Sequence, residues 1–247
     1  MFFNLFKKGY FIIILKKILK RFEKDNSKLA SEWAKKNCRI DTDEYCKSID
    51  PNLWNETKYE CNKILNEGNK ILEKFSHSLG GAGNFFLLYF FVRKFKPAIV
   101  IETGVAAGWS SVAILRAFKK NNFGKLFSSD FPYFRLKNPE KFIGVLVKNE
   151  NNKDRWQLDV RGDEIAIPSF LNKIGNLNVD LVHYDSDKSY SGREFVLNKL
   201  SKNLGKNSII IFDDIQNNLH FKDYVTKYNS NYTVMQFKKK YLGIINL

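Results

Sequence analysis

Acidic residues stand at the ends of three short apolar runs in this sequence. One run ends at Glu102, a second is followed by Asp185, and a third is followed by Asp213 and Asp214. If these runs are parallel strands of one sheet, their carboxyl ends meet at the edge where ligands bind. Carboxylates crowded there repel one another unless protons or a cation are bound. A hard divalent ion, Mg²⁺ by preference, would offset that repulsion, so the sequence predicts a cation site at this edge.

A glycine-containing turn interrupts the first of these regions. Residues 98–115 read AIVIETGVAAGWSSVAIL: a β-branched run, a turn at Gly104 and Gly108, and apolar residues at helical spacing from Trp109. This order predicts a strand, a tight turn and a helix. Glycine lets the backbone approach a ligand, and the first N–H groups of a helix favour a carboxylate or phosphate. The phosphate-loop motif is absent and the dinucleotide fingerprint lacks its third glycine, which argues against these two kinds of nucleotide site. A glycine turn that binds no ligand is an alternative.

The remaining elements alternate between strands and helices. A helix is predicted from the Asp185 segment to Leu204, closed by Gly205. The other predicted strands cover 125–130, 156–160, 179–184 and 208–212, and 232–237 with 241–245 form a terminal hairpin. The pattern predicts an α/β, Rossmann-like, doubly wound and mostly parallel seven-stranded sheet with a terminal antiparallel hairpin. An N-terminal helical extension precedes it.

The second predicted strand ends in a carboxylate that could bind a nucleoside. Asp130 stands at the tip of this strand, beside the glycine turn. An acidic side chain there can accept both hydroxyls of a ribose, and a helix or turn cap is the alternative. Residues 131–154 form a long insertion beside the same edge, which is typical of a lid or a substrate wall.

The chain is predicted to have three parts: a basic amphipathic helix at 1–24, a helical cap or substrate region at 25–97, and the α/β domain at 98–247. The apolar run in 1–24 is too short to span a membrane, and a small-residue cleavage site is missing. This helix would either lie on an anionic membrane or cap the domain. Residues 85–95, FFLLYFFVRKF, predict a buried helix that leads into the first strand.

Charge and cysteine content limit the choice of compartment and partner. The net charge is +15 with a pI near 9.6, which favours anionic partners, although scattered lysines also fit ordinary solvated faces. Cys38, Cys46 and Cys61 are odd in number and lack Cys-x-x-Cys spacing. This argues against a disulfide framework or a zinc site and favours a reducing cytoplasm.

The combined motifs resemble a known enzyme class. The pattern Glu102-x-Gly104-x-x-x-Gly108-x-Ser110 resembles the first motif of class I S-adenosylmethionine-dependent methyltransferases. Together with the segments Asp185-Ser-Asp-Lys and Asp213-Asp214, it is similar to metal-dependent O-methyltransferases of the catechol and caffeoyl-coenzyme A type. It is closer to bacterial small-molecule and sugar O-methyltransferases. The likeness covers residues 98 to about 228 and makes 98–247 the cofactor-binding domain.

The resemblance assigns a role to each motif residue. It implies that the cofactor is bound by Glu102, Gly104, Gly108, Ser110, Asp130, Asp163 and Asp185, that the metal is bound by Asp185, Asp213 and Asp214, and that Lys188 and Asp185 are catalytic. Within the cofactor set, Ser110 takes the methionine carboxylate, Glu102 faces the methionine end, Asp130 binds the ribose and Asp163 the adenine. Lys188 would accept the proton of the attacking hydroxyl, because a nearby divalent ion pushes a lysine toward its neutral form.

Some positions depart from the resembled pattern or stay open. The third metal ligand is Asn in the catechol type and Asp214 here, and some relatives have His in place of Lys188. Asp185 could instead contact only the cofactor, as in metal-free enzymes of this class. His183 is expected to be a core histidine, and His220 is a candidate second base.

The implied function is a cytoplasmic S-adenosylmethionine-dependent methyltransferase, assisted by Mg²⁺ or another divalent cation, that acts on a hydroxyl of a sugar or other small metabolite. A metal-independent enzyme with another acceptor, including RNA, is one alternative. The other is a catalytically silent, membrane-associated binding protein of the same fold. The Asn/Asp-Pro-Pro-aromatic motif of base methylation is absent, so a small-molecule or glycan partner is expected rather than nucleic acid. Membrane contact through 1–24 and a homo-oligomer stay open, and no motif identifies the acceptor.

Overall fold

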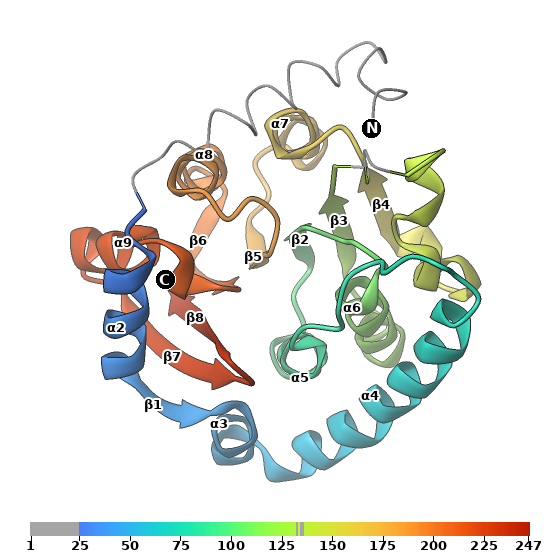
Figure 1. The fold of residues 1–247 in the computed structure, drawn as a ribbon, viewed down its shortest axis with the longest axis horizontal. Helices are drawn as coiled ribbons and strands as arrows, with labels where there is room; N and C mark the ends of the chain where they lie inside the picture. Colours follow the sequence, from blue (N-terminus) through green and yellow to red (C-terminus); the bar gives the residue numbers. More distant parts are fainter. Residues whose placement is uncertain (1–24, 132, 134–135) are drawn as a thin grey trace.

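The computed structural model describes residues 25–131, 133 and 136–247. The helix predicted for 1–24 lies outside the described residues. The described chain folds around one sheet that has helices on both faces (Figure 1). This arrangement confirms the predicted doubly wound α/β fold.

The sheet has eight strands in the order β1-β7-β8-β6-β5-β2-β3-β4. Their bounds are β1 Cys38–Asp41, β2 Ile99–Thr103, β3 Lys125–Ser129, β4 Trp156–Asp159, β5 Val179–Tyr184, β6 Leu204–Phe212, β7 Asn231–Phe237 and β8 Lys240–Asn246. Strand β8 is antiparallel to β6 and β7, and all other neighbours are parallel. The seven predicted strands and the terminal hairpin are therefore confirmed. Strand β1 is an addition, because it pairs with β7 from a segment that was expected to be helical.

The helices form one layer on each face of the sheet. Their bounds are α2 Ser27–Asn37, α3 Thr42–Ile49, α4 Pro51–Leu72, α5 Phe85–Phe95, α6 Trp109–Asn121, α7 Asp163–Ile174, α8 Tyr190–Leu200 and α9 His220–Tyr228. Short 3₁₀ helices are η3 Pro139–Phe142, η4 Val145–Asn149, η5 Lys153–Arg155 and η6 Ile215–Asn217. Buried side chains of α4, α5 and α6 pack on one face of the sheet, and those of α2, α7, α8 and α9 pack on the other.

Two segments differ from their predicted form. Helix α8 ends at Leu200, and Leu204 already begins β6, so Gly205 is a strand residue and does not close a helix. Its N–H donates to Ser208 Oγ at 2.8 Å, which holds the start of the strand. The insertion at 131–154 is partly core, since Val145, Leu146 and Val147 of η4 are buried beneath α6.

Strands β2 to β6 run in the same direction, so the sheet has two distinct edges. We call the edge where these strands end the carboxyl edge, and the edge where they begin the amino edge. The helix predicted at 85–95 is confirmed as α5, which is buried along most of its length and reaches the amino edge at Phe95. In the described part of the chain, no helix is long and apolar enough to cross a membrane.

Candidate active site

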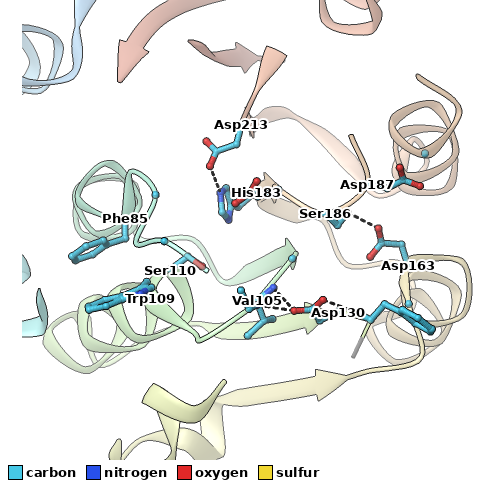
Figure 2. Close-up of a pocket in the computed structure, with 18 of the residues that line it drawn as sticks. Phe85, Val105, Trp109, Ser110, Asp130, Asp163, His183, Ser186, Asp187 and Asp213 are labelled. Atoms are coloured by element: carbon cyan, nitrogen blue, oxygen red, sulfur yellow. Dashed lines mark hydrogen bonds and ion pairs between the residues drawn. The ribbon is translucent and has the colours of Figure 1, made fainter. Parts of the chain in front are cut away.

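A cavity lies at the carboxyl edge, where the loops after β2, β3, β5 and β6 meet (Figure 2). Its walls include six predicted site residues: Gly104, Ser110, Asp130, Asp163, Asp185 and Asp213. The segment 81–85 and Tyr133 close another side. The structure thus brings together most of the residues that the sequence placed at this edge.

The glycine turn after β2 is shaped by close backbone contacts. Gly104 has φ +87°, and a Cβ added to it would lie 2.4 Å from the carbonyl oxygen of Asp185. Gly108 has φ +101° and starts α6, where an added Cβ would lie 3.1 Å from Cα of Gly144. Gly104 lines the cavity, whereas Gly108 instead contacts the insertion. Both positions need glycine, because L side chains rarely adopt this conformation and have no room here.

Asp130 follows β3 and holds the glycine turn. Its Oδ2 accepts hydrogen bonds from the N–H groups of Val105 (3.0 Å) and Ala106 (2.7 Å), and its Oδ1 accepts one from Phe131 N–H (2.6 Å). Asp130 lines the cavity beside Val105 (Figure 2). The carboxylate is therefore in position for a ligand while it also fixes the loop that would surround one.

Asp163 is the first residue of α7 and faces the cavity from the side opposite to Asp213 (Figure 2). Its two carboxylate oxygens accept hydrogen bonds from the hydroxyls of Ser129 and Ser186, each at 2.5 Å. These bonds join the ends of β3 and β5 to the start of α7. The side chain is thus held in one orientation by its neighbours.

Glu102 does not line the cavity, although the sequence placed it at the methionine end. It is completely buried, and its Oε2 accepts hydrogen bonds from the hydroxyls of Ser111 and Ser128, both at 2.6 Å. Ser128 in turn accepts a hydrogen bond from Trp156 Nε1 at 2.8 Å. The carboxylate points into the layer beneath the site, so its contact with the site is indirect and runs through His183.

His183 lies between two carboxylates. Its Nδ1 is 3.9 Å from Glu102 Oε1, and its Nε2 is 3.8 Å from Asp213 Oδ2 (Figure 2). Burial alone would lower the pKa of this imidazole, but Asp213 and Glu102 raise that pKa to about 10. The histidine is buried, as expected for a core residue, yet it also lines the cavity. Sequence reasoning missed that His183 lines the cavity, although the His-x-Asp spacing at the end of β5 could have indicated it.

Asp185 and Asp213 form the acidic end of the cavity. Burial, and then the charge of Asp213, raise the pKa of Asp185. Burial also acts to raise the pKa of Asp213, but the neighbouring His183 lowers it overall. Single ligand atoms of His183, Asp185 and Asp213 all lie within 4.8 Å of one another. Among the described residues, these three side chains could hold a metal ion.

Asp214 stands apart from that group. It has φ +54°, does not line the cavity, and pairs with Lys188 Nζ at 2.9 Å and Lys240 Nζ at 3.0 Å. The structure therefore does not place Asp214 with Asp185 and Asp213 as a third ligand. The turn after β6 directs the two adjacent carboxylates to different partners.

Lys188 bridges Asp185 and Asp214 and does not line the cavity. Burial acts to lower the pKa of Lys188, but the two carboxylates raise it above its ordinary value. Two negative charges face the ammonium group and favour its charged form, whereas the expected shift toward a neutral lysine requires a divalent ion nearby. His220, the candidate second base, is buried under α8 with Nε2 3.2 Å from Glu194 Oε2 and lies outside the cavity wall.

The turn after β6 depends on one further residue that has no sequence signal. Arg193 of α8 is fully buried, and its Nη2 donates to the carbonyl oxygens of Asp213 (3.0 Å) and Asp214 (2.8 Å). Arginine in the middle of a helix normally faces solvent. The position of Arg193 in the sequence could not reveal that its side chain holds this turn.

Comparison with known proteins agrees with this geometry. Residues 101–215 match the model of a family described as a methyltransferase domain. This range begins within β2 and ends at the start of η6, so it includes every predicted cofactor and metal residue. The comparison with curated proteins found no relative.

Solved structures share the fold at low sequence identity. One is the O-methyltransferase TomG from Streptomyces achromogenes, involved in tomaymycin synthesis, in complex with S-adenosylmethionine. It has a TM-score of 0.58 and 14% identity and covers 74% of this chain and 89% of that one. Another is an O-methyltransferase from Bacillus cereus in complex with S-adenosylhomocysteine, with a TM-score of 0.56, 13% identity and coverage of 76% and 90%. Residues 101–215 are thus similar to a methyltransferase domain, and the chain shares the fold of these O-methyltransferase structures.

Proposed function

We propose that this class I S-adenosylmethionine-dependent methyltransferase transfers the methyl group to a hydroxyl oxygen of a sugar or other small metabolite, with the assistance of a divalent cation. The observation that carries the proposal is the single cavity wall shared by the glycine turn, Asp130 and Asp163 on one side and His183, Asp185 and Asp213 on the other. The first group suits a nucleoside with an amino-acid end, and the second suits a hydroxyl group and a cation.

The cofactor side provides oriented donors and acceptors. Unpaired N–H groups at the start of α6, beside Ser110, favour the carboxylate of the methionine part. Asp130 and Asp163 offer carboxylate oxygens for ribose hydroxyls and for the adenine amino group. Bound S-adenosylmethionine supplies the methyl group from its sulfonium. The serine hydroxyls that hold Asp163 keep its carboxylate oriented before the ligand enters.

The donors on the other side fit a divalent cation. Burial, and then the charge of Asp213, raise the pKa of Asp185, and a cation bound between the two carboxylates would relieve their repulsion. His183 adds a nitrogen donor near Asp213 once the cation has displaced its proton. One nitrogen and two carboxylates suit Mn²⁺, Fe²⁺ or Zn²⁺ at least as well as Mg²⁺, which prefers oxygen. When bound, such an ion lowers the proton affinity of a coordinated hydroxyl. We therefore propose His183, Asp185 and Asp213 as its ligands in this chain.

The charges in the cavity also bear on the acceptor. Among the described residues that line it, Asp130, Asp163, Glu164, Asp185, Asp187 and Asp213 are acidic, whereas Arg161 and His183 are the basic ones. Arg161 is in turn paired with Asp159. A neutral hydroxyl compound fits such a wall better than a polyanion does. This supports a small neutral acceptor over RNA, despite the positive net charge of the chain.

The first experiment is calorimetric titration of the protein with S-adenosylmethionine, in Mn²⁺, in Mg²⁺ and in chelator. We expect binding of the cofactor in all three buffers and separate binding of Mn²⁺ to the protein. A panel of sugars and phenols then tests methyl transfer. Absence of cofactor binding in every buffer would refute the methyltransferase proposal. Cofactor binding without metal binding would support the methyltransferase proposal but refute the assistance by a metal ion.

Substitution of Asp213 tests the acceptor side. Asp213→Asn should weaken Mn²⁺ binding at least about tenfold, because it removes one charged ligand, and should leave the affinity for S-adenosylmethionine within about threefold. Asp154→Asn, an exposed carboxylate on η5, is the matched control and should change neither affinity. Unchanged Mn²⁺ binding in Asp213→Asn would refute the proposed ligand set.

A further inference from the structure

The amino edge of the sheet carries large apolar side chains in contact with solvent. Phe95 and Phe123 are each 49% exposed, and Leu177 is 62% exposed. Phe95 and Phe123 border a groove whose floor includes Phe91, Pro97 and Ile209. We call Phe95, Phe123 and Leu177, together with the lysines described below, the amino-edge patch.

These apolar side chains lie at one end of the molecule because of the fold. Phe95 ends α5, Phe123 follows α6 and Leu177 follows α7, and each of these helices leads into a parallel strand. The strands β3, β2 and β5 are neighbours in the sheet. Adjacent strands are about 4.8 Å apart, so the three loops cover roughly 10 Å along one edge. The three loops that carry these apolar groups are therefore neighbours along the amino edge.

Lysines with no carboxylate partner surround the apolar groups. Lys96, Lys125 and Lys206 are exposed, and none of them forms an ion pair with another described residue. Lys96 lines the groove, Lys125 N–H bonds to Ala98 at its border, and Lys206 precedes the groove residue Asn207. The positive charge of this patch is thus not cancelled locally.

The acidic residue in the groove wall is directed inward. Asp180 Oδ2 accepts hydrogen bonds from the N–H groups of Ala98 (2.7 Å) and Ile99 (3.0 Å). Arg155 adds a further cation beside Phe123, since its guanidinium donates to Gly124 O and Asn122 Oδ1. Exposed aromatic groups with flanking cations match the composition of proteins that lie on anionic lipid.

We propose that the amino-edge patch docks on an anionic lipid surface. The apolar side chains would enter the region between headgroups and acyl chains, and the lysines would face lipid phosphates. A second copy of the chain is a poorer occupant, because a two-fold axis through this patch would place the same lysines against one another. The proposal does not depend on the methyl acceptor or on the metal.

This surface is distinct from the N-terminal segment for which membrane contact was predicted. Strand β1 is parallel to β6 and begins at the amino edge, and α2 precedes it directly. Helix α2 therefore begins near the carboxyl edge, where it contacts η6 after the end of β6. The described chain therefore begins on that side, away from the amino-edge patch.

The test is co-sedimentation of the full-length protein with vesicles of phosphatidylcholine alone or with 30% phosphatidylglycerol as the chosen composition, on the order of the anionic content of a charged leaflet. We expect retention on the anionic vesicles that falls with added salt. Phe95→Ser with Phe123→Ser, and separately Lys96→Glu with Lys125→Glu and Lys206→Glu, should each reduce the partition coefficient at least about tenfold.

Matched controls use the same substitutions on another face. Tyr59→Ser removes an aromatic side chain that is 61% exposed on α4, and Lys70→Glu with Lys74→Glu reverses exposed charges near the end of α4. These variants should retain wild-type partition. Failure of the wild type to bind anionic vesicles would overturn the proposal, and so would unchanged binding in both patch variants, which would assign the binding to residues 1–24. Capture of an acidic protein without vesicle binding would also overturn it.

Discussion

The two edges of the sheet differ in charge and in packing. At the carboxyl edge, carboxylates contact serines, backbone N–H groups and His183, and Arg193 donates to the backbone carbonyls of Asp213 and Asp214. Most of these partners are buried. At the amino edge, lysines and apolar side chains are exposed, and the groove lies beside the ends of α5 and α6. The net charge of +15 therefore describes the outer surface and not the cavity. Composition alone would have suggested an anionic acceptor for a site whose walls are acidic.

The largest expected difference between the edges involves two glycines with positive φ. Gly104→Ala should destabilise the fold by about 3 kcal/mol or more and abolish binding of S-adenosylmethionine, because the new Cβ would meet the Asp185 carbonyl at 2.4 Å. Gly175, at the amino edge, also has positive φ, but an added Cβ would meet no atom within 4 Å. Gly175→Ala should cost only about 1–2 kcal/mol. Urea unfolding measures the stability of both variants, and calorimetry measures their binding of S-adenosylmethionine. Equal losses of stability in the two variants would contradict the expected difference between the edges.

A second, smaller difference in stability is expected between substitutions of two cationic residues, one at each edge. Arg193→Met should lower the free energy of unfolding by about 2–4 kcal/mol, since the carbonyls of Asp213 and Asp214 lose their buried donor. Lys206→Met at the amino edge should change it by less than about 0.5 kcal/mol. Urea titration of the two variants gives the values. A stability gain in Arg193→Met would show that the burial of its charge costs more than its hydrogen bonds contribute.

The smallest effect concerns pH. Burial, and then the charge of Arg193, lower the pKa of His220 from 6.5 to about 4 in the folded protein. Between these values the unfolded chain binds more protons than the folded one, so stability from this group is present above pH 6.5 and is lost as pH falls toward 4. The slope from one group is at most about 1.4 kcal/mol per pH unit. His220→Asn should reduce the slope measured by urea unfolding at pH 4.5 to 7.

The exposed His77 gives the matched control for that measurement. His77→Gln should leave the slope as it is in the wild type. A wild-type slope in His220→Asn as well would show that other groups account for the acid sensitivity.

The fold was predictable because its signals are local. Strand β5 and helix α5 have the predicted bounds, since a continuous apolar run bounded by polar residues or proline admits few alternatives. Strand β1 was missed because four residues with one isoleucine carry no periodic signal, and their pairing with β7 joins segments almost 200 residues apart. The end of α8 was misplaced because a glycine near a helix end also fits a strand start.

The site was predictable in its location but not in its internal pairing. Sequence order places Asp185 and Asp213 at one edge, and the structure brings both into the cavity. The direction of a side chain in the turn after β6 depends on backbone angles that spacing does not specify. Sequence order therefore could not show that Asp214 pairs with Lys188 and Lys240 while Asp213 lines the cavity. His183 lies opposite Glu102 on the neighbouring strand, and no linear sequence motif can show such a cross-strand contact.

The polar contacts beneath the site also limit how this protein can evolve. A row of polar contacts crosses the sheet through the adjacent strands β4, β3, β2 and β5 and ends just after β6. Its members are Trp156, Ser128, Glu102, His183 and Asp213. Loss of any partner in the row leaves a buried charge or donor unpaired, which is costly in itself, whereas joint replacement by apolar residues need not be. Sequences that descend from this one should therefore either conserve all five residues or replace several of them at nearly the same time. Divergence at the exposed amino edge carries no such restriction on the fold.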